Sequence, residues 1–181
     1  MKIVAFGASN SRNSINKKWA HFVANQFNAT QIHVLDLNDY EMPLYSIDKE
    51  QEIGLPQEAH QFVEDIQNAD LLIISLSEHN GTYTTAFKNI FDWASRVQLK
   101  FFENKKMLLM ATAPGPRGGQ GVLEAAVSRF PIHGAEIVET FILPSFNANF
   151  DVQNEILNEA MQSELHQMLD RVMQKVLLTN N

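Results

Sequence analysis

Apolar runs of strand length alternate with amphipathic segments of helix length along the whole chain. The expected strands are residues 2–6, 31–37, 70–75, 107–113 and 136–143. The expected helices are residues 14–27, a helix that follows Pro56, and residues 84–97, 119–130 and 152–178. This alternation is typical of a parallel sheet covered by helices on both faces. The pattern therefore predicts an α/β fold.

The expected strands differ in how deeply their composition suggests they are buried. Residues 71–74 and 107–110 are apolar without interruption, which favours central strands covered on both faces. Residues 31–36 mix polar and apolar side chains, as expected of an edge strand. The last helix is predicted from apolar residues at helical spacing. They are Ile156, Ala160, Leu165, Leu169, Val172 and Val176.

The connection after the second expected strand, residues 38–55, has no clear periodicity. Long loops inside compact domains are often functional. An equally good interpretation is a surface cover in which Met42, Leu44 and Tyr45 pack against the body of the domain.

Length, charge and composition limit the class of protein and the kinds of partner that this chain can have. The 181 residues, 45% of them hydrophobic, are enough for one sizeable core and predict a single domain over residues 1–181. A net charge of −7 disfavours a nucleic-acid partner. The absence of cysteine excludes disulfides, thiolate metal sites and a catalytic thiol. No apolar run approaches the ~20 residues of a membrane span, so we expect a cytoplasmic protein with no membrane partner.

Polar donors are concentrated directly after the first expected strand. Three hydroxyls (Ser9, Ser11 and Ser14) and the Arg12 guanidinium lie where the N–H groups of a helix start would already face an anion. Such groups suit a phosphate. The alternative is that Ser14 only caps the helix. Because the loop has neither G-x-G-x-x-G nor a Walker-type lysine, a mononucleotide cofactor fits better than a nicotinamide dinucleotide or a transferred phosphate.

Two further turns follow the third and fourth expected strands. Asn80-Gly81 is a strong turn signal before a helix, and its backbone amides are suited to a planar polar ring. Residues 112–119 contain glycines that permit a close approach, although a simple strand-to-helix turn would look the same. Parallel sheets bind ligands at the carboxyl ends of their strands, so three such loops favour a shared site.

With these motifs the chain resembles the NADPH-dependent FMN reductase family. The family's first loop, roughly G-S-x-R-x-x-S-x-N, is matched by Ser9, Ser14 and Asn16, while Ser11 takes the arginine position and Arg12 follows it. The second motif, P-E-Y-N-G-S followed by A-L-K-N-x-x-D-W, is matched at most positions. The matching residues are Glu78, Asn80, Gly81, Ala86, Lys88, Asn89, Asp92 and Trp93, while Ser77, His79 and Thr82 replace Pro, Tyr and Ser.

The resemblance implies a flavodoxin-like three-layer sandwich with strand order 2-1-3-4-5 and a bound FMN. It implies hydride transfer from NADPH or NADH through FMN to a quinone-like or other small acceptor, with no catalytic side chain. His79 is then either a tuner of the flavin or a substitution that faces solvent. The cofactor-binding residues it implies are Ser9, Ser11, Arg12, Ser14, Ile15, Asn16, Ser77, Glu78, His79, Asn80, Gly81, Thr82, Thr112, Ala113, Pro114, Gly115 and Gly118.

The resemblance also implies a homodimer or higher homo-oligomer. The helix at residues 84–97 has more apolar residues than one core face needs, so some of them could face a partner, although core burial alone would explain them equally. Two other functions stay open. One is a flavodoxin-type electron carrier without its own NAD(P)H oxidation, and the other is a domain whose flavin site is vestigial and that binds only partners. The scattered histidines show no metal-binding spacing.

Overall fold

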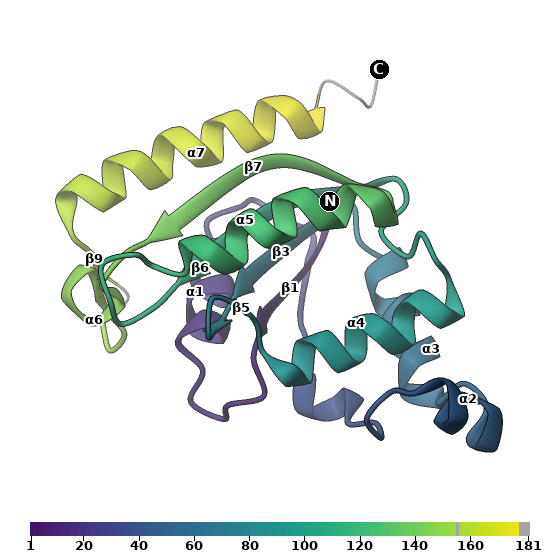
Figure 1. Ribbon diagram of the computed structural model, residues 1–181. Helices are drawn as coiled ribbons and strands as arrows, with labels where there is room; N and C mark the ends of the chain where they lie inside the picture. Colours follow the sequence, from purple (N-terminus) through teal and green to yellow (C-terminus); the bar gives the residue numbers. More distant parts are fainter. Residues whose placement is uncertain (155, 178–181) are drawn as a thin grey trace.

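Five parallel strands form the central sheet of the computed structural model, which describes residues 1–154 and 156–177 (Figure 1). Their order across the sheet is β2-β1-β3-β6-β7. This is the predicted order 2-1-3-4-5, because the labels also count short strands outside the sheet. The five strands are β1 (Lys2–Ala8), β2 (Gln31–Val34), β3 (Leu71–Leu76), β6 (Lys105–Thr112) and β7 (Ala135–Leu143).

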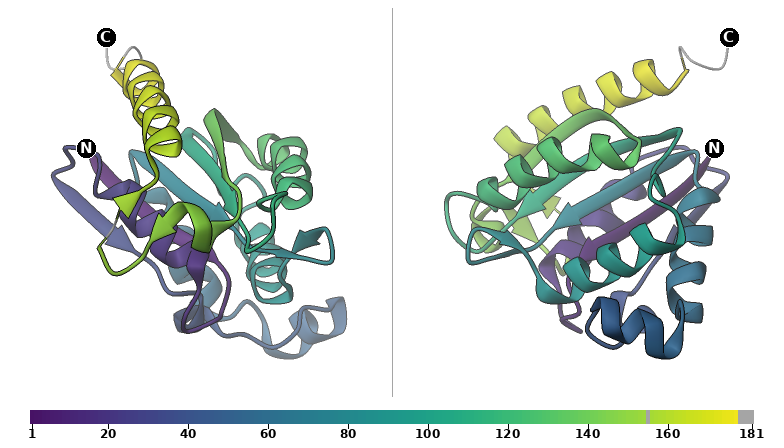
Figure 2. Two further views of the ribbon diagram at one scale, coloured as in Figure 1. Left: turned by 90° about the vertical axis from the view of Figure 1, so that its left-hand side faces the viewer. Right: turned by 45° about the vertical axis from the view of Figure 1, so that its right-hand side comes forward.

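Helices cover both faces of this sheet, which confirms the three-layer architecture (Figure 2). One face carries α1 (Ile15–Ala24) and α7 (Glu159–Leu177). The other carries α3 (Gln57–Gln67), α4 (Thr85–Val97) and α5 (Gln120–Arg129).

The period-2 alternation of β1 separates the two cores. Val4 and Phe6 contribute to the core beneath α3, α4 and α5, while Ile3 and Ala5 contribute to the core beneath α1 and α7. Every residue of β3 is buried, as its continuous apolar run predicts for a central strand. The less buried β2 lies at the edge.

The segment after β2 is more regular than expected. The second strand ends at Val34 rather than residue 37, because the Asp36 carboxylate accepts the N–H of Asn38 and caps the 3-10 helix η1 (Leu37–Tyr40). Ser46 likewise caps α2 (Ile47–Ile53). The segment therefore contains two short helices where a long loop was expected, because local side-chain caps rather than an apolar face define these helices.

The last helix begins later than predicted, at Glu159 rather than residue 152. It is preceded by α6 (Phe146–Asn149) and by a hairpin of β8 (Phe150–Asp151) and β9 (Ile156–Leu157). The Asp151 carboxylate accepts the N–H groups of Gln153 and Asn154, which favours a turn over a helix. Ala160 is exposed, whereas the other four predicted core positions within α7 are buried. Residue 178 lies outside the described residues.

The apolar side chains of α4 pack into the core of this chain. Five of them are buried in its core, and Val97 is half-buried. Of the two interpretations left open by the sequence, core burial is therefore the correct one for these side chains. The five buried residues are Phe87, Ile90, Phe91, Trp93 and Ala94.

No helix among the described residues is long and apolar enough to cross a bilayer.

Candidate functional site

The three loops singled out in the sequence leave the sheet at one edge. Ala8 at the end of β1 pairs with Leu76 at the end of β3, and Leu76 pairs with Ala111 near the end of β6. The chain segments that follow these residues are therefore neighbours across the sheet, as the parallel topology requires (Figure 1).

The first loop comprises residues 9–14, because residues 7 and 8 belong to β1 and residues 15 and 16 to α1. Ser9 and Ser14 are buried, whereas residues 10–13 are exposed. Ser14 caps α1 by accepting the Lys17 N–H at 3.2 Å, and the Ser9 hydroxyl accepts the Ser11 N–H at 3.1 Å. Since each oxygen acts as an acceptor, each hydroxyl hydrogen is left to donate to a phosphate. The capping role is real and is compatible with anion binding.

A close approach of backbone to backbone places α1 over this loop. A Cβ on Gly7 would lie 2.2 Å from the amide nitrogen of Lys17 and 2.6 Å from the carbonyl carbon of Asn16. Only glycine allows this contact between β1 and the first turn of α1. The contact holds the start of α1, where the first N–H groups have no intrahelical partner, at the sheet edge.

The side chain of Asn16 connects all three loops. Its Nδ2 donates to the Ser77 hydroxyl at 2.9 Å and to the Thr112 carbonyl at 3.1 Å. Its Oδ1 accepts the Ser75 hydroxyl at 2.7 Å and the Thr112 N–H at 3.2 Å. A carboxamide has two donors and two acceptor positions, so all four are satisfied within the protein. Asn16 is 3% exposed and ties α1 to the ends of β3 and β6.

The second loop is a short β-hairpin made of β4 (Glu78–His79) and β5 (Thr82–Tyr83). Asn80 and Gly81 form its turn with φ of 51° and 83°, the pair of positive values that a type I′ turn requires. Thr84 anchors the hairpin by donating to the Ala8 carbonyl at 3.0 Å, and it also caps α4.

Two side chains of the hairpin face the interior, while His79 is exposed. Glu78 faces the start of α5, because a Cβ on Gly121 would lie 2.6 Å from its Oε1. Tyr83 packs on Phe91 and Phe130, and burial raises the pKa of its phenol to about 12.

The third loop is supported by a segment that the sequence analysis did not single out, residues 143–146. The Thr112 hydroxyl donates to the Leu143 carbonyl at 2.7 Å, and the Ala113 carbonyl accepts the Phe146 N–H at 3.0 Å. Gly118 has a φ of 58°, and a Cβ there would lie 2.4 Å from Ile142. The outer part of the loop, residues 114–117, is exposed.

A cavity of about 500 Å³ lies between the first loop, the hairpin and the segment after β2. This volume is within the range of small-molecule sites. Asn10 comes from the first loop, His79 from the hairpin, and Tyr40 and Met42 from the segment after β2. Among the described residues that line the cavity, none belongs to the third loop.

The helix α4 holds the outer wall of this cavity in place. Asn89 donates to the carbonyls of Met42 and Pro43, both at 3.1 Å, and its Oδ1 accepts the Tyr45 N–H at 2.8 Å. The Trp93 indole donates to the Pro43 carbonyl at 2.8 Å. The asparagine and tryptophan of the A-x-K-N-x-x-D-W motif therefore act as a clamp on residues 42–45, a role that the sequence pattern did not reveal.

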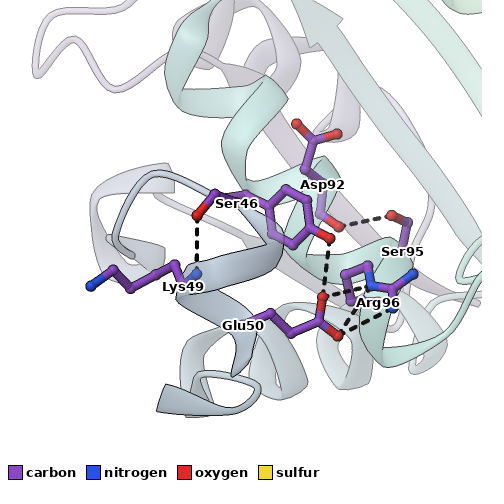
Figure 3. A network of polar contacts seen from close by, with 7 residues as sticks. Ser46, Lys49, Glu50, Asp92, Ser95 and Arg96 are labelled. Atoms are coloured by element: carbon purple, nitrogen blue, oxygen red, sulfur yellow. Dashed lines mark hydrogen bonds and ion pairs between the residues drawn. The ribbon is translucent and has the colours of Figure 1, made fainter. Parts of the chain in front are cut away.

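An ion pair extends this clamp to α2. Figure 3 shows Glu50 facing Arg96 of α4, at 2.9 Å between Oε2 and Nε. The Tyr45 hydroxyl also donates to Glu50 at 3.0 Å. The hydrogen bond from Arg96 lowers the pKa of the Glu50 carboxyl, so the pair persists to acidic pH.

Comparison with known proteins identifies the family. The sequence profile described as NADPH-dependent FMN reductase matches residues 1–148. The chain belongs to this family. An NAD(P)H-dependent FMN reductase of Pseudomonas aeruginosa is 29% identical over 131 residues, which cover 71% of this chain and 70% of that protein. A 2-hydroxy-1,4-benzoquinone reductase of a Burkholderia species is 36% identical over 97 residues, 53% of this chain and 51% of that protein.

Solved structures share the fold of this FMN reductase family member. The flavoenzyme NAD(P)H:(acceptor) oxidoreductase FerB of Paracoccus denitrificans superposes with a TM-score of 0.76 at 18% identity, covering 97% of this chain and 96% of that one. At this identity the likeness concerns the fold.

The residues of the three loops fit an FMN. Buried hydroxyls with hydrogens left to donate and the N-terminus of α1 suit a phosphate dianion, and the turn of the hairpin offers backbone groups to a polar ring. The described residues contain no group of three or more His, Cys, Asp or Glu side chains that could hold a metal ion.

We expect Asn89→Ala to disturb the cavity wall while leaving the phosphate loop intact. The substitution leaves the carbonyl of Met42 and the N–H of Tyr45 without their partner, so residues 42–45 lose their fixed position. The KM for the electron acceptor should rise several-fold, whereas the Kd for FMN, measured by fluorescence titration, should stay within about twofold. Lys88→Ala, which removes only the exposed pair with Asp92, is the matched control. An unchanged KM in Asn89→Ala would show that the wall does not contact the acceptor.

Proposed function

We propose that this member of the NADPH-dependent FMN reductase family oxidises NAD(P)H and reduces a quinone-like or other small acceptor through FMN bound at the carboxyl edge of the sheet. The observation that carries the proposal is the set of four hydrogen bonds that the Asn16 side chain donates or accepts. They join the first loop, which suits a phosphate, to the hairpin and the third loop, which we call the ring-suited loops. The Burkholderia relative is named for reduction of a benzoquinone, which favours acceptors of this class.

Each loop has a proposed task. The hydroxyls of Ser9, Ser11 and Ser14 and the N–H of Ile15 hold the phosphate, with Arg12 at the exposed side of the loop. The hairpin (residues 77–82) and the third loop (residues 112–118) contact the ring with backbone groups. FMN, when bound, supplies the chemistry that passes a hydride between nicotinamide and acceptor.

The protein contributes position and electrostatics in this proposal. The turn at Asn80 and Gly81 fixes backbone groups at the sheet edge, and the 500 Å³ cavity beside it has room for a second small molecule. His79 lies at the border between the hairpin and this cavity, where a charge on its imidazole would favour an anionic reduced flavin. Replacing His79 by Tyr and measuring the flavin midpoint potential tests that role, and an unchanged potential excludes it.

The homo-oligomer implied by the family remains part of the proposal. We assign the contact with the partner to three exposed large apolar side chains of the segment after β2: Leu44, Ile47 and Ile53. A monomer mass by light scattering at working concentration would rule out this state.

The absorption spectrum of the purified protein tests cofactor and reaction together. We expect a flavin spectrum that bleaches rapidly under anaerobic NADPH and returns when a benzoquinone is added. A flavin spectrum that does not bleach would favour the electron-carrier alternative. A colourless protein with no gain in thermal stability on adding FMN would favour a vestigial site, because a ligand that binds only the native state must stabilise it.

Single substitutions in the first loop separate its serines from its arginine. We expect Ser14→Ala to weaken FMN binding more than Arg12→Ala, because Ser14 is buried at the start of α1 whereas Arg12 is exposed. Ser14→Ala also removes a helix cap, which costs about 1 kcal/mol. Ser46→Ala removes the cap of α2 and should lower stability without changing the Kd for FMN, measured by fluorescence titration. A larger loss in Arg12→Ala would assign the phosphate to the guanidinium.

A further inference from the structure

A groove lined mainly by basic residues, separate from the 500 Å³ cavity, lies along α1. Its volume is about 400 Å³, and four of its six lining residues carry basic side chains. The chain as a whole has a net charge of −7, so this is a local concentration of positive charge on an acidic protein. The lining residues are Arg12, Ser14, Lys17, Lys18, His21 and Val34.

Part of this charge has no counter-charge among the described residues of the chain. The Lys17 ammonium pairs with the Asp36 carboxylate at 2.5 Å, and this contact lowers the pKa of Asp36. Arg12 and Lys18 form no ion pair with any residue that the structure describes. The His21 ring lies 3.1 Å from the Asn25 amide. The groove therefore offers one guanidinium and one ammonium group to an anion from solution.

The groove begins beside Ser14, which is assigned to the FMN phosphate, and extends along α1 beyond the reach of that phosphate. That phosphate is assigned to the serine hydroxyls of the first loop and to the N–H of Ile15. Lys18 and His21 follow three and six residues later, which places His21 roughly 9 Å further along the helix axis. The first loop borders both hollows, since Asn10 lines the cavity whereas Arg12 and Ser14 line the groove.

The strand order places the groove within reach of a nicotinamide dinucleotide. Val34 ends β2, while the ring-suited loops follow β3 and β6. In the strand order β2-β1-β3-β6, β2 lies two strand spacings from β3 and three from β6. At ~4.8 Å for each spacing, the groove lies roughly 12 Å from a point midway between β3 and β6. A dinucleotide with its nicotinamide over β3 and β6 can thus place its adenosine end over β2.

We propose that the groove formed by Arg12, Lys18 and His21 binds the 2′-phosphate of NADPH and thereby selects NADPH over NADH. The inference rests on the proposed function, because it assumes that the nicotinamide reaches the ring-suited loops. A 2′-phosphate is a monoester dianion, for which a guanidinium fork and an ammonium group are matched partners. NADH has a hydroxyl at this position and gains nothing from the two charges.

The substitution Lys18→Ala tests the groove without touching the start of α1. We expect the KM for NADPH to rise about ten-fold. The KM for NADH and the Kd for FMN should stay within about twofold. Lys100→Ala, which removes an exposed lysine paired with Glu103, is the control and should change none of the three.

Calorimetric titration with 2′,5′-ADP tests the groove independently of catalysis. The wild-type protein should bind 2′,5′-ADP more tightly than ADP, and Lys18→Ala should remove the difference. Equal losses for NADPH and NADH, or no preference for 2′,5′-ADP, would overturn the proposal. A loss of FMN affinity in Lys18→Ala would overturn it too, by assigning the groove to the flavin phosphate. If the wild-type protein oxidises neither nicotinamide, the proposed function fails, while the titration still decides the groove.

Discussion

Replacing Asn16 by alanine is expected to weaken FMN and riboflavin binding by the same factor, about ten-fold or more. Asn16 uses all four of its hydrogen-bonding positions within the protein, so it has none left for a phosphate. Asn16 can therefore change the affinity for flavin only by positioning the loops that it connects. Riboflavin lacks the phosphate but has the same ring. An equal loss of affinity for FMN and for riboflavin would therefore show that the ring-suited loops have been displaced.

The same substitution should destabilise the protein without flavin. It removes the hydrogen bonds that Asn16 forms with the buried Ser75 hydroxyl and with both backbone groups of Thr112, at about 1–3 kcal/mol for each group that finds no other partner. Ser75→Ala is the matched control, because it removes one of the four hydrogen bonds and should cost less stability and less flavin affinity. Asn16→Asp keeps the acceptor of Ser75 but places a carboxylate oxygen against the Thr112 carbonyl, so it should not restore binding.

Fluorescence titrations with FMN and riboflavin, together with the unfolding midpoint of the apoprotein, distinguish the possible roles of Asn16. A direct contact with the phosphate would weaken FMN alone and leave riboflavin unchanged, and that outcome would contradict the positioning role. Failure of wild-type protein to bind either flavin would instead refute the proposed cofactor.

The sheet was predictable because the depth at which a strand is buried determines how continuous its apolar residues are, and this is visible within the strand's own sequence. The continuous apolar run of β3 and the mixed composition of β2 were enough to assign a central and an edge position. The errors arose where one polar side chain decided the local structure. Asp36 ends β2, Ser46 starts α2, and Asp151 forms a turn where apolar spacing alone continued the last helix.

The candidate site was predictable as a set of loops but not as a network. Asn16 was selected as a matching motif position, yet its bonds to Thr112 span 96 residues of sequence. No local pattern reports contacts of that range. The clamp of Asn89 on Met42 and Pro43 and the support of the third loop by residues 143–146 were missed for the same reason.

The second large effect is expected for Gly7→Ala. The added Cβ would lie 2.2 Å from the Lys17 amide nitrogen and 2.6 Å from the Asn16 carbonyl carbon, both of which are backbone atoms of α1. Because neither atom can turn away as a side chain would, the first turn of α1 must move off β1. Overpacking of this kind costs about 1–3 kcal/mol or more. The movement also carries Asn16 and the phosphate-suited N–H groups away from their partners.

We therefore expect Gly7→Ala to lower the unfolding midpoint of the apoprotein and to weaken FMN binding at least as much as Asn16→Ala, since it displaces the phosphate loop and the ring-suited loops together. Gly115→Ala is the control for stability, because a Cβ there meets nothing within 4 Å, and its unfolding midpoint should match the wild type. Gly7→Ala that does not accumulate as folded protein is the stronger form of the same result. A folded Gly7→Ala with wild-type midpoint and wild-type FMN affinity would show that α1 tolerates displacement from β1, and the site would then not depend on this contact.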